Sequence, residues 1–147
     1  MLKSPDARLH GFDSFVGLPE DFDVGGGPLI KGTFSTQGMV PVVDDERVRF
    51  FKGWFDQVLP DYSVPEHEVL VINTDADLYS STICVLRRLR PWIRRGSFIY
   101  FDQMSRMEHE PKAFGEFMRE SGLKFRGVCA DKSLNNAFFE CVAQSDA

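Results

Sequence analysis

Acidic side chains follow two apolar runs of the chain, at the point where each run ends. The run VLVINT is followed by Asp75 and Asp77, and the run SFIYF is followed by Asp102. Short apolar runs of this kind are typical of buried parallel strands, which helices cover on both faces. Open α/β sheets bind their ligands at the carboxyl ends of such strands. We therefore expect the three carboxylates to converge on one rim and to form a site.

The composition is that of an ordinary globular protein, and it indicates a single domain over residues 1–147. Of the 147 residues, 43% are hydrophobic and 27% are charged, and a chain of this length can bury a sizeable core. A formal net charge of −5 disfavours a nucleic-acid partner. No apolar run approaches the ~18 residues that span a membrane. Three widely spaced cysteines and a start that does not resemble a signal peptide predict a cytoplasmic protein with reduced thiols.

Alternating strand and helix patterns predict an α/β fold that finishes in an antiparallel hairpin. The predicted strands cover residues 8–12, 47–51, 69–73, 98–101, 124–129 and 137–142. A helix is expected over residues 82–95 with a break at Pro91, and a second from about Pro111 to Gly122. Residues 14–41 hold six glycines and three prolines, which predicts a long irregular excursion over the surface.

Four sequence motifs occur in the order and spacing of one enzyme family. They are GFDSFVGLPEDF (11–22), VRFFKGWFDQVLP (48–60), DADLYSST (75–82) and GSFIYFDQ (96–103). Together they resemble the macrocin O-methyltransferase group of class I S-adenosylmethionine-dependent methyltransferases, from about Ala7 to the end of the chain. The resemblance implies a Rossmann-like, mostly parallel sheet. It also implies methyl transfer from S-adenosylmethionine to a hydroxyl of a sugar or another small polar acceptor.

The resemblance assigns four residues to the cofactor. Asp13, at the end of a predicted strand, matches the acidic residue that accepts hydrogen bonds from both ribose hydroxyls, and Ser14 follows it. An ionised carboxylate only accepts hydrogen bonds, which suits that role. Gly53 and Trp54 match residues near the adenine. From the residues alone, Asp13 and Ser14 could equally cap a turn, and Trp54 could belong to the core.

The resemblance also places the reaction at Asp75 and Asp102, which match carboxylates that act as a base or bind a metal. The family often carries two consecutive acids at the second place, where this chain has Gln103. We therefore expect Asp75, Asp102 and Gln103 to form at most a weak Mg²⁺ site. Asp77 precedes the predicted helix, and the sequence favours an N-cap role for it.

His109 and Glu110 precede Pro111 in the loop after the predicted strand 98–101. In class I methyltransferases this loop borders the substrate. A contact with substrate and a position on the protein surface are equal alternatives for this pair.

The glycine-rich turn of class I methyltransferases is absent from the sequence, because none of the 12 glycines forms GxGxG or GxGxxG in the right context. Only twelve residues precede Asp13, whereas a strand, turn and helix need roughly thirty. The chain is therefore expected to be truncated at its N-terminus and to lack the central strand. Strands 8–12 and 69–73 would then pair directly, a second copy would supply a strand, or the chain is a fragment of a longer product. Open strand edges predict a homo-oligomer.

Two classes of function follow from these observations. The first is an S-adenosylmethionine-dependent O-methyltransferase with a small-molecule acceptor, which the retained carboxylates favour. The second is a non-catalytic, truncated methyltransferase-like domain that forms dimers, which the missing glycine turn favours. An unrelated Rossmann-like metal hydrolase is a third, weaker alternative.

Overall fold

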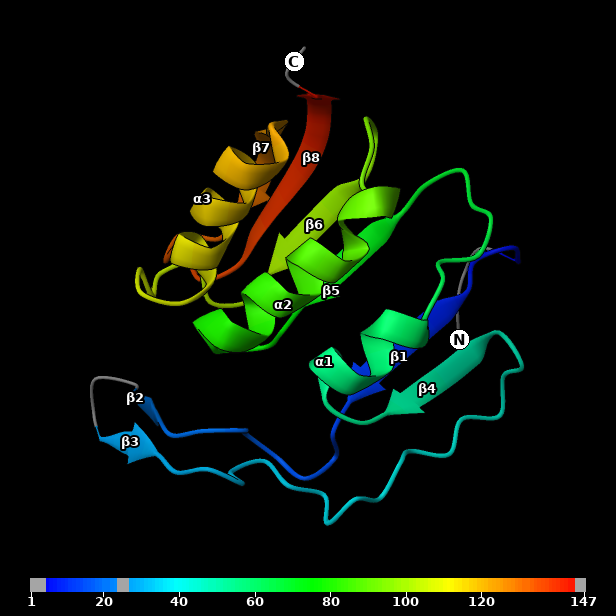
Figure 1. Cartoon of the computed structure of the whole chain (residues 1–147), viewed down its shortest axis with the longest axis vertical. Coiled ribbons are helices and arrows are strands. Elements are labelled where there is room, and N and C mark those ends of the chain that lie inside the picture. The colour runs from blue at the N-terminus through cyan, green and yellow to red at the C-terminus, as the bar shows by residue number, and fades with distance from the viewer. Residues whose placement is uncertain (1–4, 24–26, 145–147) are drawn as a thin grey trace. The chain divides into compact units, whose positions relative to one another are not determined.

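The computed structural model describes residues 5–23 and 27–144 (Figure 1). The chain divides into two compact units, Met1–Tyr62 and Ser63–Ala147. In the described part of the chain, no helix is both long enough and apolar enough to cross a membrane.

The first unit contains a parallel pair of strands, β1 (Leu9–Asp13) and β4 (Val48–Lys52). Their register places Asp13 opposite Lys52, so both strands end at the same edge. One face of this pair is aromatic: the Phe12 ring stacks on that of Phe51 at 4.8 Å, and the Tyr62 ring lies edge-on to both. The two predicted strands of this region are confirmed, each displaced by one residue.

Short elements in the first unit depart from the sequence predictions. The excursion over residues 14–41 is not wholly irregular, because β2 (Phe22–Asp23) and β3 (Pro28–Leu29) pair within it. The helix α1 (Phe55–Val58) and the 3₁₀ helix η1 (Leu59–Asp61) follow β4. These four short elements show neither a hydrophobic period nor an apolar run bounded by polar residues, so the sequence pattern does not reveal them.

The second unit contains a four-stranded sheet in the order β5–β6–β8–β7. The strands β5 (Val71–Thr74) and β6 (Phe98–Phe101) are parallel. The strand β8 (Ala137–Gln144) runs antiparallel to β6 and also to β7 (Leu123–Ala130). The predicted parallel pair and the closing antiparallel hairpin are both confirmed.

The helices of the second unit, α2 (Tyr79–Leu89) and α3 (Glu110–Ser121), lie side by side on one face of its sheet (Figure 1). The α-helical part ends at Leu89, and the 3₁₀ helix η2 (Arg90–Trp92) contains Pro91, so the predicted break is confirmed. The helix begins three residues before the predicted start. Gly122 ends α3 in a left-handed conformation with φ of 68°, which glycine adopts without steric cost.

The core of the second unit lies between the sheet and these two helices. Ile99 and Phe101 of β6, Leu86 of α2 and Phe117 of α3 are all at most 1% exposed. The Phe101 ring contacts that of Phe114 with a centroid distance of 4.9 Å. This packing fixes the directions of β5 and β6, whose ends carry the candidate site.

Direct pairing of the strands predicted over residues 8–12 and 69–73 is one of three alternatives, and it stays a prediction, because the two strands belong to different compact units. β1 pairs with β4 and β5 pairs with β6, in separate sheets. A strand supplied by a second copy or by a longer product stays a prediction.

Candidate active site

The two strands that lead to the rim end in register. Thr74 is the last residue of β5, Phe101 is the last residue of β6, and the two are opposite each other. The Thr74 hydroxyl donates to the Tyr100 carbonyl at 2.7 Å and ties the strand ends together. Asp75 and Asp102 are each the next residue along the chain. The structure therefore places both at the same edge of the sheet, as the sequence predicts.

The three predicted rim carboxylates act on one another electrostatically. The pKa of Asp77 is raised, first by burial of its carboxyl group and then by the negative charges of Asp75 and Asp102. The positive charges of Arg106 and His109 oppose this rise. Asp77 therefore holds a proton more readily than an isolated carboxylate does.

Asp77 does not cap α2, and the N-cap prediction for it is wrong. The N-cap residue is Leu78, whose side chain makes no capping hydrogen bond. Asp77 has a left-handed backbone with φ of 57°, a conformation that aspartate tolerates better than most residues. Its Oδ1 accepts a hydrogen bond from Nε2 of Gln103 at 2.6 Å. The side chain therefore joins the neighbouring loop instead of the helix.

The side chain and the backbone N–H of Gln103 are both hydrogen-bonded at the rim. Its backbone N–H donates to Oε2 of Glu110 at 2.7 Å, and its side-chain Nε2 donates to Asp77. Its Oε1 accepts from Nε of Arg106 at 2.7 Å. The amide oxygen that the predicted Mg²⁺ site would require is thus already bound to a cation. Because Oε1 is engaged in this way, the Gln103 amide does not fit the predicted role of a Mg²⁺ ligand. Within the described ranges, no group of three His, Cys, Asp or Glu side chains is placed to hold a metal ion.

Glu110 is a buried acid beneath the rim. It is the first residue of α3 and is 0% exposed. The alternative that placed Glu110 on the protein surface is therefore wrong. Burial raises the pKa of Glu110 to about 7, and the charges of Asp102 and Asp75 add to this rise. Backbone hydrogen bonds from Gln103 and Ala76 oppose it. In the sequence, Glu110 is recognisable only as an acid directly before Pro111 at the start of a predicted helix. This pattern does not reveal that its side chain is buried.

His109 occupies the junction between the two helices of the second unit. Its Nδ1 accepts a hydrogen bond from the backbone N–H of Tyr79 at 3.3 Å, and its side chain is half-buried. The Tyr79 hydroxyl donates to Oε2 of Glu116 at 2.7 Å. The start of α2 is therefore bonded to α3 and to the loop before it, which limits movement of the rim.

The four predicted cofactor residues lie at one end of the first unit's sheet. Asp13 is the last residue of β1, and its carbonyl accepts a hydrogen bond from the N–H of Gly53 at 2.9 Å. Trp54 follows as the N-cap of α1 and is half-buried. Gly53 has φ of 147°, and a Cβ there would lie 2.6 Å from a methyl carbon of Val58. The close turn therefore requires glycine at position 53.

The carboxylate of Asp13 is exposed and only partly engaged. Its Oδ1 accepts a hydrogen bond from the N–H of Phe15 at 2.5 Å, which is the turn-capping role considered from the sequence. Its Oδ2 accepts no hydrogen bond from the described residues. Ser14 donates to the Gly17 carbonyl at 3.3 Å and accepts from the Val16 N–H at 3.2 Å. Capping thus uses one oxygen of Asp13, and the second oxygen can accept from a ligand hydroxyl.

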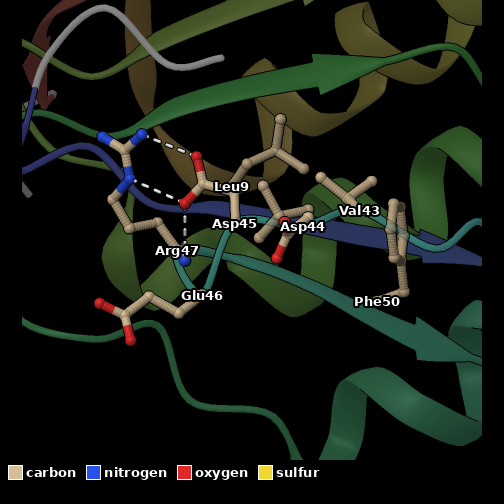
Figure 2. A pocket seen from close by; sticks show the side chains of 8 residues that line it. Leu9, Val43, Asp44, Asp45, Glu46, Arg47 and Phe50 are labelled. Atoms are coloured by element: carbon tan, nitrogen blue, oxygen red, sulfur yellow. Dashed lines mark hydrogen bonds and ion pairs between the residues drawn. The ribbon is translucent and has the colours of Figure 1, made fainter.

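A separate hollow in the first unit has a volume of about 730 Å³. Its lining consists of Leu9, Val43, Asp44, Asp45, Glu46, Arg47, Val48 and Phe50 (Figure 2). Figure 2 shows the Arg47 guanidinium bound to the Asp45 carboxylate, with an Nη2 to Oδ2 distance of 2.7 Å. This hydrogen-bonded pair holds the pKa of Asp45 at about 2. None of the predicted site residues lines the hollow.

Two sequence relatives share part of this chain. One is the 8-demethyl-8-(2,3-dimethoxy-alpha-L-rhamnosyl)-tetracenomycin-C 4'-O-methyltransferase of Streptomyces olivaceus, 35% identical over 97 residues, which are 66% of this chain and 32% of that protein. The other is the mycinamicin III 3''-O-methyltransferase of Micromonospora griseorubida, 29% identical over 97 residues, 66% of this chain and 34% of that protein. The matched part thus spans about a third of the length of these relatives.

Two solved structures share the fold. The O-methyltransferase NovP superposes with a TM-score of 0.66 at 21% identity, covering 94% of this chain and 61% of that one. The calicheamicin methyltransferase CalS11 gives a TM-score of 0.63 at 22% identity, covering 94% of this chain and 62% of that one. The predicted Rossmann-like methyltransferase fold is therefore confirmed.

The profile of the macrocin-O-methyltransferase (TylF) family matches residues 29–130. This match covers more than half of the chain and includes Gly53, Trp54, Asp75, Asp102 and Gln103. The chain therefore belongs to the macrocin-O-methyltransferase family.

Proposed function

We propose that this chain carries the reaction edge and the ribose-binding loop of an S-adenosylmethionine-dependent O-methyltransferase. The observation that supports this most is the convergence of Asp75, Asp77 and Asp102 at the ends of β5 and β6 in a member of this family. By their names, the two relatives are O-methyltransferases, one acting at the 4' position of a rhamnosyl-tetracenomycin and one at the 3'' position of mycinamicin III. A sugar or another small polar molecule is the acceptor that we propose here.

Asp75 and Asp102 have different surroundings, which suggests different roles. Asp75 is exposed at the end of β5 and can meet an acceptor hydroxyl from solvent. Asp102 is half-buried, and its Oδ1 accepts a hydrogen bond from the Tyr100 hydroxyl at 3.2 Å. We assign proton removal from the acceptor to Asp75 and orientation of that hydroxyl to Asp102. S-adenosylmethionine, when bound, supplies an electrophilic methyl group.

The residues of the first unit fit the ribose end of this cofactor. Asp13 has an exposed carboxylate with Oδ2 available as an acceptor, and Gly53 keeps the adjoining turn close to it. Trp54 would offer an aromatic surface to the adenine, and Ser14 would hold the loop that carries Asp13. These assignments are part of the proposal.

Calorimetric titration with S-adenosylhomocysteine tests the proposal directly. We expect measurable binding, which Asp13→Ala weakens because a carboxylate accepts two hydroxyl hydrogen bonds that alanine cannot. Asp61→Ala is the matched control, since Asp61 is an exposed acid in η1 of the same unit. Absence of heat at millimolar ligand would overturn cofactor use by this chain.

The second candidate is a non-catalytic methyltransferase-like domain. The sequence feature that favours it is the lack of a glycine-rich GxGxG or GxGxxG turn. This candidate predicts no binding of S-adenosylhomocysteine and no effect of Asp13→Ala, so the same titration separates the two functions.

We further propose that residues 1–147 form one partial methyltransferase domain, because the family match crosses from the first compact unit into the second. The homo-oligomeric state and cytoplasmic location are proposals that rest on the sequence. A single monomeric species in analytical sedimentation would contradict the first of these. Recovery of Cys84, Cys129 or Cys141 in a disulfide would contradict the second, since none of these three cysteines forms a disulfide in the structure.

A further inference from the structure

The side chain of Gln103 connects the two loops that carry the rim carboxylates. We propose that Gln103 is a positioning residue that joins these loops directly, and that the Arg106 guanidinium supplies the positive charge there, so that the rim is organised without a divalent cation. This proposal rests on the proposed function only for the chemistry assigned to Asp75 and Asp102. We call the hydrogen bonds that Gln103 makes to Asp77, Arg106 and Glu110 the joint. All of these contacts lie within the second unit.

The geometry of the joint uses both polar atoms of the Gln103 side chain and its backbone N–H. Nε2 donates across to Asp77 in the loop after β5, at 2.6 Å. Oε1 accepts from Nε of Arg106 in its own loop at 2.7 Å, which fixes the orientation of the amide. The backbone N–H donates down to the buried Glu110 at 2.7 Å. Through its side-chain amide and its backbone N–H, Gln103 thus links the half-buried carboxylate of Asp77 to the buried carboxylate of Glu110.

The electrostatics of the rim agree with this arrangement. Asp75, Asp77 and Asp102 share the rim, and mutual repulsion of such groups must be offset by a nearby cation or by proton uptake. Arg106 and His109 are the positive groups that lower the pKa of Asp77. Mg²⁺ requires near-octahedral oxygen ligands. To bind Oε1 of Gln103, Mg²⁺ would have to displace the Arg106 guanidinium from that oxygen while remaining close to the positive charge of the guanidinium.

The backbone of Asp77 supports a positioning role as well. Its φ of 57° is unusual for a residue other than glycine, and the adjoining turn is closed by a hydrogen bond of 2.5 Å from the Leu78 N–H to the Ala76 carbonyl. Strained backbone persists where surrounding contacts determine it. The bond from Gln103 is such a contact, because it holds the Asp77 carboxylate from the opposite loop.

Titration with Mg²⁺ alone, by calorimetry, tests whether the joint replaces a metal. We expect no saturable binding by the wild-type chain at millimolar Mg²⁺. The variant Gln103→Asp adds an acid beside Asp102 and removes the donor to Asp77, so its Mg²⁺ affinity should rise at least about tenfold. Gln57→Asp, an exposed position in α1, adds the same charge elsewhere and should leave the affinity unchanged. Wild-type binding as tight as that of Gln103→Asp would overturn the proposal.

Hydrogen exchange of a second variant decides the positioning role even if Gln103→Asp does not fold. Gln103→Met keeps the length of the side chain and removes its amide. We expect amide exchange in residues 75–78 to rise roughly tenfold or more as the loop is released, while exchange within β6 stays unchanged. A purely structural role would raise exchange in both segments together, and this result would overturn the assignment. These readouts need neither cofactor nor acceptor, so they stand or fall separately from the proposed function.

Discussion

The buried carboxylate of Glu110 accepts a hydrogen bond from the backbone N–H of Gln103 at 2.7 Å, directly beneath the acidic rim. Glu110 begins α3, whereas Gln103 lies two residues beyond β6. The contact therefore fixes the loop between strand and helix at both of its ends. Because burial and the charges of Asp102 and Asp75 both disfavour ionisation, the acid that holds this loop titrates near neutral pH.

The stability of the chain should fall as pH rises from 4.5 to about 7. The pKa of Glu110 is raised from 4.5 to about 7 in the folded chain, so the folded state holds its proton more tightly than the unfolded state over this interval. The contribution of Glu110 to the free energy of unfolding is then largest below pH 4.5. It is lost as the pH rises to about 7 and the carboxyl group ionises, by at most on the order of 3 kcal/mol. Glu110→Gln cannot ionise and should remove this slope.

Urea unfolding at several pH values measures the effect. Glu108→Gln is the control, because Glu108 is an exposed acid two residues away whose side chain pairs only with Lys112 among the described residues. It should retain the wild-type pH profile. Parallel profiles for wild type and Glu110→Gln between pH 4.5 and 7 would show that Glu110 does not titrate in this range.

Asp75→Asn should slow methyl transfer and leave cofactor affinity unchanged. The carboxamide keeps the shape of the side chain but cannot take the acceptor's proton, and general-base catalysis contributes about 10²–10⁴-fold to rates. The measurement is the rate of S-adenosylhomocysteine formation with a sugar acceptor, beside calorimetric cofactor binding. Asp61→Asn, an exposed change in η1, should alter neither. Loss of cofactor binding in Asp75→Asn would place Asp75 at the cofactor instead of the acceptor.

The rim was predictable because strand ends are encoded locally. The apolar runs stop at Thr74 and Phe101, and a parallel pairing of equal length brings the next residues, Asp75 and Asp102, to one edge. Six strands and two helices were identified for the same reason, since each spans enough residues to show a hydrophobic pattern.

The bonding of the rim could not be predicted from the sequence. Asp77 has a left-handed backbone, and its carboxylate accepts a hydrogen bond from Gln103, a residue 26 positions away. The burial of Glu110 depends on packing beneath the loops, whereas charged residues before a helix are usually exposed. The preference of aspartate for helix N-cap positions is a local property of the sequence. Asp77 does not cap α2, and its carboxylate instead accepts the long-range hydrogen bond from Gln103.

The ion pairs between α2 and α3 should contribute little to stability. Nη2 of Arg87 lies 2.6 Å from both Glu116 and Glu120, but the three side chains are exposed enough for water and salt to screen their charges. Arg87→Ala is expected to lower the urea midpoint slightly at low salt and not measurably at high salt. Arg88→Ala is the matched control on the same helix, because Arg88 is exposed and has no ion pair within the described ranges. A salt-independent loss would mean that the Arg87 stem packs against α3.

Gly17→Ala should destabilise the first unit more than Gly32→Ala does. Both glycines have positive φ, 87° and 85°, so each alanine meets the same backbone penalty of about 1–2 kcal/mol. At Gly17 the added Cβ would also lie 2.3 Å from the Thr33 carbonyl oxygen, whereas at Gly32 the nearest atom is 4.0 Å away.

The clash at Gly17 cannot be relieved by a side-chain rotation, because the neighbouring atoms belong to the backbone. The Leu18 N–H donates to the Thr33 carbonyl at 3.0 Å, and the Gly32 N–H donates to the Leu18 carbonyl at 2.9 Å. Relief would break this pair of bonds, so Gly17→Ala should cost about 1–3 kcal/mol beyond Gly32→Ala. Urea unfolding followed by Trp54 fluorescence, with Trp92 replaced by phenylalanine, compares the two variants in this unit. Equal midpoints would mean that the segments 17–18 and 32–33 separate without loss of stability, and that their backbone contact does not hold the loop that follows Asp13.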